Sequence, residues 1–550
     1  MKIKICLWIT LMWSSSVGFT QQDPSNDIDF EILKNLELFE MVYKSVDLNY
    51  VDEPNPGELM RTGIEAMLAE LDPYTNYIPE SLMEDYKLMT TGQYGGIGAI
   101  IRQVKEQVMV IEPYENYPAQ KAGLKAGDVF LEIDGKSVEN LTSSQVSEKL
   151  KGQPGKDLSL KISRQGKQMD FTFAREEIKM PSVPYYGFVS DNIGYIKLNS
   201  FTQTAAKEVL DAYNALQKQG TVEKLIFDLR GNGGGLLNQA NQIVNFFVKK
   251  GSDIVEIKGR AEGVNHKYTA KANPVDAKIP IVVLIDGGSA SASEIVSGAF
   301  QDLDRAVIVG TTSFGKGLVQ RPMDLKYNAK IKVTIAKYYT PSGRCIQKLD
   351  YSHKKVGEHA NEMDESTLKK FKTGNGRTVI DGRGVEPDVS IAKDTLHELS
   401  AILMIDNIIF EYVTKFSQTN ASIAKSGEFE LSDAAYESFK TFALAQDFEY
   451  TNASLELLKE LKLDMEADGL YTEAKTTYDA LYEKLKPVKS DDLEKYKPEI
   501  KLLIEDEIIG RYYFQKGRIE QSLVKDKNVL EAIKILNDQS RYNDILKIQN

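Results

Sequence analysis

The chain has 550 residues, of which 42% are hydrophobic and 27% charged, and it carries a formal net charge of −12. This length is too great for one hydrophobic core and the composition excludes a wholly disordered protein, so we expect three or four globular domains. The acidic balance argues against nucleic acid as a partner, because nucleic-acid-binding proteins usually present a basic face.

The amino terminus is predicted to be a targeting segment. Lys2 and Lys4 precede the apolar run "ICLWITLMW", and small residues follow as far as Thr20. This order is typical of a cleaved export signal, and the run is too short to span a bilayer comfortably. We interpret residues 1–20 as a signal peptide and expect an exported protein of the periplasm or cell envelope, without a stable transmembrane anchor. The alternative is an uncleaved anchor.

Residues 27–91 are predicted to be an N-terminal helical region. Apolar residues recur there at spacings of three and four, as in "FEILKNLELFEMVYKSV". Residues 92–176 are predicted to form a compact, mostly β module, because short strand patterns alternate with glycine-containing turns. One helix is expected in this module at "TSSQVSEKLKG", with Thr142 or Ser143 as its N-cap.

Residues 177–395 alternate between strand and helix patterns, which predicts a largely parallel sheet covered by helices. Sites in such sheets form at the carboxyl ends of strands. Two loops at such ends, "RGNGGG" and "DGGSASASE", have the glycine and hydroxyl content of a site. Residues 396–550 show the broad apolar stripes of packed helices and no recognisable motif, so we expect a structural or dimerising extension.

The stretch "VGTTSFGKGLVQ" around Lys316 matches a P-loop except at its last position, where Gly317 replaces the Ser or Thr that would hold Mg²⁺. Pro322 also interrupts the helix that should follow. A nucleotide-binding protein is therefore a disfavoured hypothesis. Cys345, the one cysteine outside the signal, is interpreted as structural, and it permits neither an intramolecular disulfide nor a cysteine-based metal site. We expect no metal and no cofactor.

Ser289, Ser291 and Ser293 lie in a turn between a strand and a helix. A serine at a helix N-terminus lies at the positive end of the helix dipole, which favours an alkoxide; the alternative is an ordinary N-cap. A serine nucleophile needs a base. A lysine can be that base when burial keeps it neutral, and Lys316 lies among glycines and apolar residues. The glycine-rich loops contain none of the four histidines, which are His266, His353, His359 and His397.

The stretch "GGSASASEIVSGAFQDLDRAVIVGTTSFGKGLVQ" closely resembles the signature of the carboxyl-terminal processing peptidases, also called tail-specific proteases. "DLRGNGGGLL", "YYTPSGRCIQ" and "GRGVEPDV" match further segments of that family, and the resemblance covers about residues 30–395. It implies a multi-domain α/β protein with a ClpP/crotonase-like serine protease core at 177–395 and an inserted PDZ domain at 92–176.

Residue by residue, the resemblance implies Ser291 as the nucleophile, Lys316 as the general base and Gln320 as the polar residue that orients the lysine. Ser289 and Ser293 then have capping or packing roles.

The resemblance places the oxyanion hole at the backbone N–H of Ala292 together with that of Gly233 or Gly234, and leaves the choice of glycine open. Asp228 and Arg230 are interpreted as braces of the glycine loop. Glu294, in the first turn of the helix, is interpreted as support for its dipole.

The stretch "YPAQKAGLKAGDVFLEIDGKSVENLT" closely resembles the most characteristic part of a PDZ domain, which binds a peptide C-terminus as an added strand. The N–H groups of Ile97, Gly98 and Ala99 are expected to bind the terminal carboxylate, and their apolar neighbours favour an apolar last residue. The expected partners are therefore proteins or peptides with apolar C-termini. The alternative is a PDZ fold that only scaffolds or gates the protease.

Together these patterns predict an exported serine endopeptidase that binds protein C-termini and cleaves through an acyl-enzyme. The alternative is a non-catalytic PDZ scaffold with a vestigial dyad. The sequence leaves open whether an adaptor or a homo-oligomer controls activity.

Overall fold

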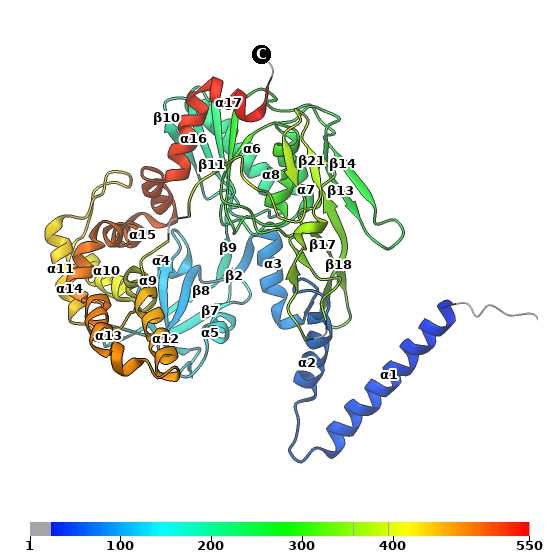
Figure 1. Ribbon diagram of the computed structural model, residues 1–550. Coiled ribbons are helices and arrows are strands. Elements are labelled where there is room, and N and C mark those ends of the chain that lie inside the picture. The colour runs from blue at the N-terminus through cyan, green and yellow to red at the C-terminus, as the bar shows by residue number, and fades with distance from the viewer. Residues whose placement is uncertain (1–23, 356, 394, 549–550) are drawn as a thin grey trace, which may run out of the picture. The chain divides into compact units, whose positions relative to one another are not determined.

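The computed structural model describes residues 24–355, 357–393 and 395–548, and the predicted signal peptide lies outside them. The chain divides into two compact units, residues 1–77 and 78–550 (Figure 1). Among the described residues, no helix combines the length and the apolar character that crossing a bilayer requires.

The first unit contains the helices that its apolar periodicity predicted, α1 (Pro24–Asn49) and α2 (Pro56–Ala69). The side-chain oxygen of Asn55 accepts the backbone N–H groups of Gly57 and Glu58. This N-cap satisfies two N–H groups that lack helical partners and so fixes where α2 begins.

The β module of the second unit is inserted between two paired strands, β2 (Gln93–Gly96) and β9 (Glu176–Lys179). Its antiparallel sheet has the order β3-β4-β5-β7-β8, which leaves β3 at one edge. Thr142 and Gln145 form a capping box at the start of α5, so Thr142 is the N-cap. The elements from residue 76 to 174 are β1 (Asn76–Ile78), η1 (Glu80–Leu82), α3 (Met83–Thr91), β3 (Ala99–Val104), β4 (Gln107–Pro113), α4 (Pro118–Lys121), β5 (Val129–Ile133), β6 (Lys136–Ser137), α5 (Ser143–Leu150), β7 (Asp157–Arg164) and β8 (Lys167–Ala174).

The βα core, residues 177–395, is built on a sheet of order β10-β11-β12-β15-β16-β23, in which only β10 is antiparallel to its neighbour. The central strand β15 is buried along its whole length, which explains its unbroken apolar sequence. The elements are β10 (Tyr185–Ser190), β11 (Ile193–Lys197), α6 (Ala205–Gln219), β12 (Lys224–Asp228), α7 (Leu237–Asn245), β15 (Ile281–Ile285), α8 (Ala292–Asp302), β16 (Val307–Gly310) and β23 (Val389–Ser390).

A second, antiparallel sheet of the βα core places β17, β18, β13 and β14 in that order. Its first strand begins two residues after Lys316, so this sheet carries the lysine loop. Its strands are β13 (Asp253–Lys258), β14 (His266–Thr269), β17 (Leu318–Asp324) and β18 (Lys330–Tyr339). Smaller elements follow: β19 (Leu349–Asp350), β20 (Asn361–Glu362), η2 (Glu365–Thr367), β21 (Lys370–Lys372) and β22 (Thr378–Ile380).

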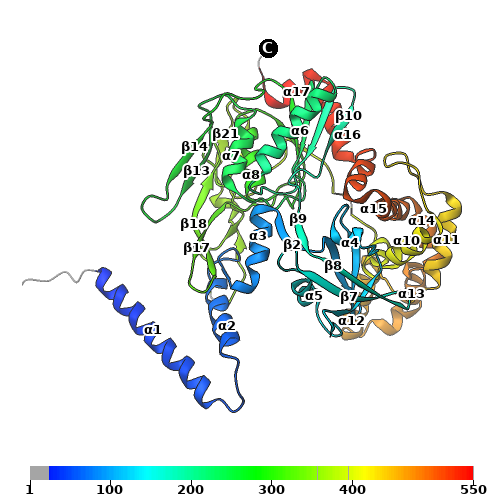
Figure 2. The ribbon, with the colours of Figure 1, turned by 180° about the vertical axis from the view of Figure 1, so that it is seen from behind.

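The helical extension packs in two places. Helices α9, α10, α11, α14 and α15 surround a hydrophobic core of their own, beside a small cluster formed by α12 and α13. In contrast, α16 and α17 cover one face of the parallel sheet, as Figures 1 and 2 show. The long helix α15, which leads from the first group of helices to α16, is kinked at Phe514. The φ of 54° at this residue lies in the region that favours glycine. The helices are α9 (Glu398–Ile405), α10 (Ile408–Thr419), α11 (Asp433–Leu444), α12 (Ala453–Ala467), α13 (Tyr471–Leu485), α14 (Lys489–Lys495), α15 (Lys497–Leu523), α16 (Lys527–Asn537) and α17 (Gln539–Leu546).

Candidate active site

Ser291 occupies a strained turn between the buried strand β15 and the helix α8. Its φ of 55° and ψ of −110° are unusual for a residue with a side chain. Such strain costs about 1–3 kcal/mol and persists where the surrounding structure imposes it. A sharp strand-to-helix turn can present a serine hydroxyl at the end of a sheet, as the nucleophile turn of α/β-hydrolases does.

The two neighbouring serines are committed to structural hydrogen bonds. The hydroxyl of Ser289 donates to the carbonyl of Leu229 at 2.9 Å, and that of Ser293 donates to the carbonyl of Asn232 at 2.8 Å. Both serines are fully buried. They tie the serine turn to the glycine loop, and they leave Ser291 as the serine of this turn that lines a cavity.

The cavity beside Ser291 has a volume of about 480 Å³. It lies where β12 and β15 end and where β17 begins, so it combines the two loops that the sequence singled out with the lysine loop. Six residues that the sequence predicted for the site line it: Gly233, Gly234, Ser291, Ala292, Lys316 and Gln320. Its remaining wall is largely apolar and includes Met89, Leu236, Ile295, Leu318 and Tyr338.

Glu294 joins the backbone of the serine turn to that of the lysine loop. One carboxylate oxygen accepts the N–H of Ser291 at 2.8 Å and the N–H of Lys316 at 2.9 Å. The other accepts the N–H of Gly315 at 2.7 Å and the hydroxyl of Ser313 at 2.5 Å. Burial raises the pKa of Glu294, although these four donors oppose the rise. The fully buried carboxylate therefore fixes the backbones of both dyad candidates.

Tyr338 forms a second link between the same two residues. Its hydroxyl lies 3.1 Å from the carbonyl oxygen of Ser291 and also within hydrogen-bonding distance of the carbonyl oxygen of Lys316. The side chain is 1% exposed and comes from β18, so the second sheet holds this hydroxyl in place. Gln320 lies on the adjacent strand, and its amide donates to the hydroxyl of Thr334 at 3.2 Å.

The glycine loop approaches the serine turn closely at Gly234. A Cβ atom at this position would lie 2.9 Å from Cβ of Ser291 and 3.0 Å from the nitrogen of Ala292, so only glycine fits. The N–H of Gly234 donates to the side chain of Asn232 at 2.9 Å. A Cβ atom at Gly233 would meet nothing within 4 Å.

Asp228 anchors the start of the glycine loop. The guanidinium of Arg230 and the ammonium of Lys197 pair with its carboxylate, and the hydroxyl of Tyr195 donates to it at 2.6 Å. Burial alone would raise the pKa of Asp228, but the two cations outweigh it and hold the pKa below its ordinary value. These contacts agree with the interpretation that Asp228 and Arg230 brace the glycine loop.

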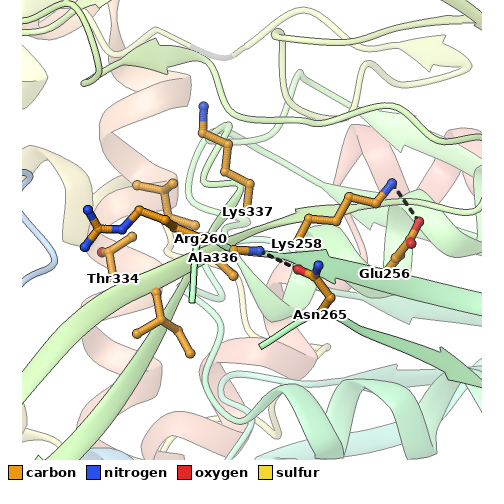
Figure 3. A pocket seen from close by; sticks show the side chains of 10 residues that line it. Glu256, Lys258, Arg260, Asn265, Thr334, Ala336 and Lys337 are labelled. Carbon is orange, nitrogen blue, oxygen red and sulfur yellow. Dashed lines mark hydrogen bonds and ion pairs between the residues drawn. The ribbon is translucent and has the colours of Figure 1, made fainter. Parts of the chain in front are cut away.

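A second hollow, of about 520 Å³, lies on β13 and β18 (Figure 3). It is lined by Lys258, Arg260 and Lys337. Figure 3 shows the charged ends of these side chains directed away from one another, and Lys258 pairs with Glu256 at 3.0 Å. The cations therefore do not converge on one point, as an anion site would require. Among the described residues, no cluster of His, Cys, Asp and Glu could hold a metal ion.

The residues predicted to bind a peptide carboxylate lie in the β module. Ile97 is buried in the core of that module, and Ala99 begins its edge strand β3. Gly98 has a φ of +72°, and a Cβ atom there would lie 2.5 Å from Cβ of Tyr117, so the turn requires glycine. The three residues therefore form a tight loop that leads into a sheet edge.

Sequence reasoning understated Glu294 and missed Tyr338. The spacing of Ser291 and Glu294 is that of a capping box, a signal that could have indicated the contact with the Ser291 N–H. No local signal connects Tyr338 with Ser291, because the two residues lie 47 positions apart and meet only through the packing of the second sheet against the serine turn.

Known families match three parts of the chain. The model for "Peptidase family S41" matches residues 192–352, that for "PDZ domain" matches 95–174, and that for "Probable PDZ-protease, C-terminal helical domain" matches 399–536. These matches confirm the predicted combination of a protease core, a PDZ domain and a helical extension.

Proteins that are similar to this chain are named as proteases, in agreement with the family resemblance found in the sequence. A carboxy-terminal-processing protease of Bartonella bacilliformis is 37% identical over 61% of this chain and 77% of that protein. A probable CtpA-like serine protease of Staphylococcus aureus is 33% identical over 57% of this chain and 62% of that protein. A solved structure, the photosystem II D1 C-terminal processing protease, is 27% identical over 64% of this chain and 92% of that chain, with a TM-score of 0.36. The chain thus belongs to the carboxy-terminal-processing protease family, within peptidase family S41, and is a serine-type peptidase.

Proposed function

We propose that the protein is an endopeptidase in which Ser291 and Lys316 form a catalytic dyad. The observation that carries the proposal is the cavity that both residues line, at a point where Glu294 fixes both of their backbones. Neutral Lys316 takes the proton from the Ser291 hydroxyl, and the oxygen attacks the carbonyl carbon of the scissile peptide bond. Gln320, which lines the same cavity, orients the lysine.

The negative charge of the tetrahedral intermediate needs hydrogen-bond donors that are already in place. We assign this role to the N–H of Ala292 together with an N–H of the glycine loop, from Gly233 or Gly234. Collapse of the intermediate breaks the peptide bond, and protonated Lys316 gives its proton to the leaving amine. A water molecule, deprotonated by Lys316, then attacks the acyl-enzyme and releases the new carboxyl terminus.

Replacement of Ser291 by alanine is expected to abolish cleavage, because it removes the hydroxyl on which the proposed acyl-enzyme forms. The measurement is cleavage of an unstructured polypeptide with an apolar C-terminus, together with the unfolding temperature of each variant. Ser293→Ala is the matched control, since it removes a hydroxyl two residues away and should retain measurable cleavage. A fully active Ser291→Ala variant would exclude the dyad, and wild-type binding without cleavage would favour the scaffold alternative.

The PDZ domain supplies the substrate, in our proposal, by adding the substrate's C-terminus as a strand beside β3. Strand β3 is an edge strand, and the loop of Ile97, Gly98 and Ala99 precedes it directly. Backbone N–H groups of this loop bind the terminal carboxylate, and the apolar surroundings of Ile97 favour an apolar last residue.

Amidation of the substrate's C-terminus is therefore expected to raise KM by about 10- to 100-fold, because hydrogen bonds to a charged group contribute about 1.5–3 kcal/mol. The value of kcat should change little. Binding of the same two peptides to the Ser291→Ala variant provides the control, since it separates affinity from cleavage. Equal KM values for the free and amidated peptides would contradict carboxylate recognition.

The amino terminus supports the further proposal that the protein is exported to the periplasm or cell envelope. Amino-terminal sequencing of the protein purified from the envelope fraction should begin directly after Thr20. Recovery of the intact amino terminus would favour the uncleaved anchor instead.

A further inference from the structure

The helical extension contacts the start of the glycine loop through an ion pair. Asp526, the N-cap residue of α16, has a carboxylate oxygen 2.7 Å from Nη1 of Arg230. The two side chains are 16% and 18% exposed, so the pair is largely shielded from water. Arg230 directly precedes the glycine loop that contains Gly233 and Gly234. The pair therefore connects the last part of the chain to a loop of the candidate site.

The packing of α16 determines where Asp526 lies. Val529, Ala532 and Ile535 are buried in the hydrophobic core that α16 shares with the parallel sheet. At the far end of the helix, the ammonium of Lys224 donates to the side chain of Asn537 at 2.7 Å. Since Lys224 begins β12 and Arg230 follows its end, α16 runs antiparallel to this strand and is held at both ends.

Asp526 balances the charges of the cluster at the start of the glycine loop. Lys197 and Arg230 carry two positive charges there, and Asp228 carries one negative charge. Asp526 provides the second negative charge. Burial alone would lower the pKa of Arg230, but the facing carboxylates of Asp228 and Asp526 raise it. Without Asp526, the cluster would keep an uncompensated positive charge in a poorly hydrated place.

The same cluster holds the backbone of Arg230. Its N–H donates to the carboxylate of Asp228 at 2.9 Å, and its carbonyl accepts the ammonium of Lys197 at 2.6 Å. Any rearrangement of these side chains therefore moves the residue from which the glycine loop starts. Because an oxyanion hole depends on donors placed to within a fraction of an ångström, such a movement would lower the rate of catalysis.

We propose that Asp526 is a positioning residue for the oxyanion hole, and that it acts through its ion pair with Arg230. One residue of the helical extension then positions the glycine loop, so the extension is not only an appendage. This inference rests on the proposed function, because it concerns the loop that stabilises the tetrahedral intermediate.

The test is Asp526→Asn, which keeps the side-chain shape and the N-cap but removes the charge. Asp526 caps α16 by accepting the N–H groups of Asn528 and Val529, and asparagine is an equally good N-cap. We expect kcat to fall about tenfold while KM for the peptide stays within twofold. Affinity for a peptide aldehyde, whose adduct with serine places an oxygen in the oxyanion hole, should fall by the same factor as kcat.

Two variants control for effects on helix packing. Asp538→Asn makes the same change at the N-cap of the next helix, α17, where the carboxylate accepts the N–H of Arg541. Asn537→Ala breaks the polar contact at the other end of α16. Both should keep wild-type kcat and aldehyde affinity, and their unfolding temperatures show how much α16 and α17 tolerate such changes.

The outcomes separate this inference from the proposed function. Three results would overturn the positioning role and leave the proposed dyad intact. They are wild-type kcat in Asp526→Asn, an equal loss of kcat in either control variant, and a rise in KM without a change in kcat. If Asp526→Asn fails to fold, Asp526→Glu tests the ion pair instead, because it keeps the negative charge on a longer side chain. Wild-type kcat and unaltered aldehyde affinity in this variant would support the ion pair. A tenfold loss in kcat would contradict it. Absence of cleavage by the wild type would refute the proposed function itself.

Discussion

The Lys316→Ala variant is expected to lose about 10³- to 10⁴-fold in kcat, with little change in peptide affinity. A serine hydroxyl is a poor nucleophile until a base removes its proton, and a positioned general base contributes about 10²- to 10⁴-fold. Lys316 lines the cavity of Ser291, and its backbone is fixed by Glu294 and contacted by Tyr338. The measurements are steady-state kcat and the rate of acylation by a chromogenic ester.

Lys316→Arg provides the sharper comparison, because it keeps the positive charge but a guanidinium does not become neutral in a protein. We expect it to be as inactive as Lys316→Ala. Lys348→Ala is the matched control: this lysine lies in the segment that contacts Gly315 and pairs with Glu362 at 2.8 Å. It should retain near wild-type kcat. An active Lys316→Arg variant would show that the charge of residue 316, and not its ability to accept a proton, supports catalysis.

Glu294→Gln is expected to lower kcat by about 10²-fold, the second large effect. The glutamine amide has one acceptor oxygen, whereas the carboxylate accepts four donors from the serine turn and the lysine loop. Two donors of these loops would then lack partners, and the relative position of Ser291 and Lys316 would change. A displacement of about 1 Å can cost about 10²-fold in rate.

Glu294→Gln is also expected to lower the free energy of unfolding, by about 1–3 kcal/mol, because it leaves two buried donors without an acceptor. Burial raises the pKa of Glu294. The contribution of this carboxyl group to the free energy of unfolding is therefore fully present below the ordinary glutamate pKa, and it diminishes as pH rises through the raised pKa. The difference in the free energy of unfolding between the wild type and Glu294→Gln should therefore be larger in acid and diminish as pH rises. The check is kcat together with the free energy of unfolding from urea titration.

Two further variants at the Glu294 site show whether the effect on rate is specific. Glu294→Ala should also destabilise the protein, by about 3 kcal/mol, because it leaves buried donors unsatisfied and creates a cavity. Ser313→Ala, which removes only one of the four donors, should cost about 1 kcal/mol and less than tenfold in kcat. A Glu294→Gln variant with lowered stability but wild-type kcat would indicate a purely structural Glu294.

Local patterns in the sequence were sufficient to predict the strands and helices of the βα core and the two loops that line the cavity. The buried strand before "DGGSASASE" and the strand before "RGNGGG" both end at the cavity, because parallel neighbours present their carboxyl ends at one edge of a sheet. The capping box at Thr142 was also readable from sequence, since it involves residues three positions apart. The family signature added the role of each residue.

The sequence by itself determined where the strands of the βα core end, where its helices start and where its glycine turns lie, because these features depend on neighbours within a few positions. Only the tertiary structure decided what holds the site residues in place. Glu294 joins two loops, Tyr338 reaches the Ser291 carbonyl from another sheet, and Asp526 of the helical extension pairs with Arg230. Such contacts depend on strand register and helix packing, which join segments far apart in the chain and leave no periodic trace in the sequence.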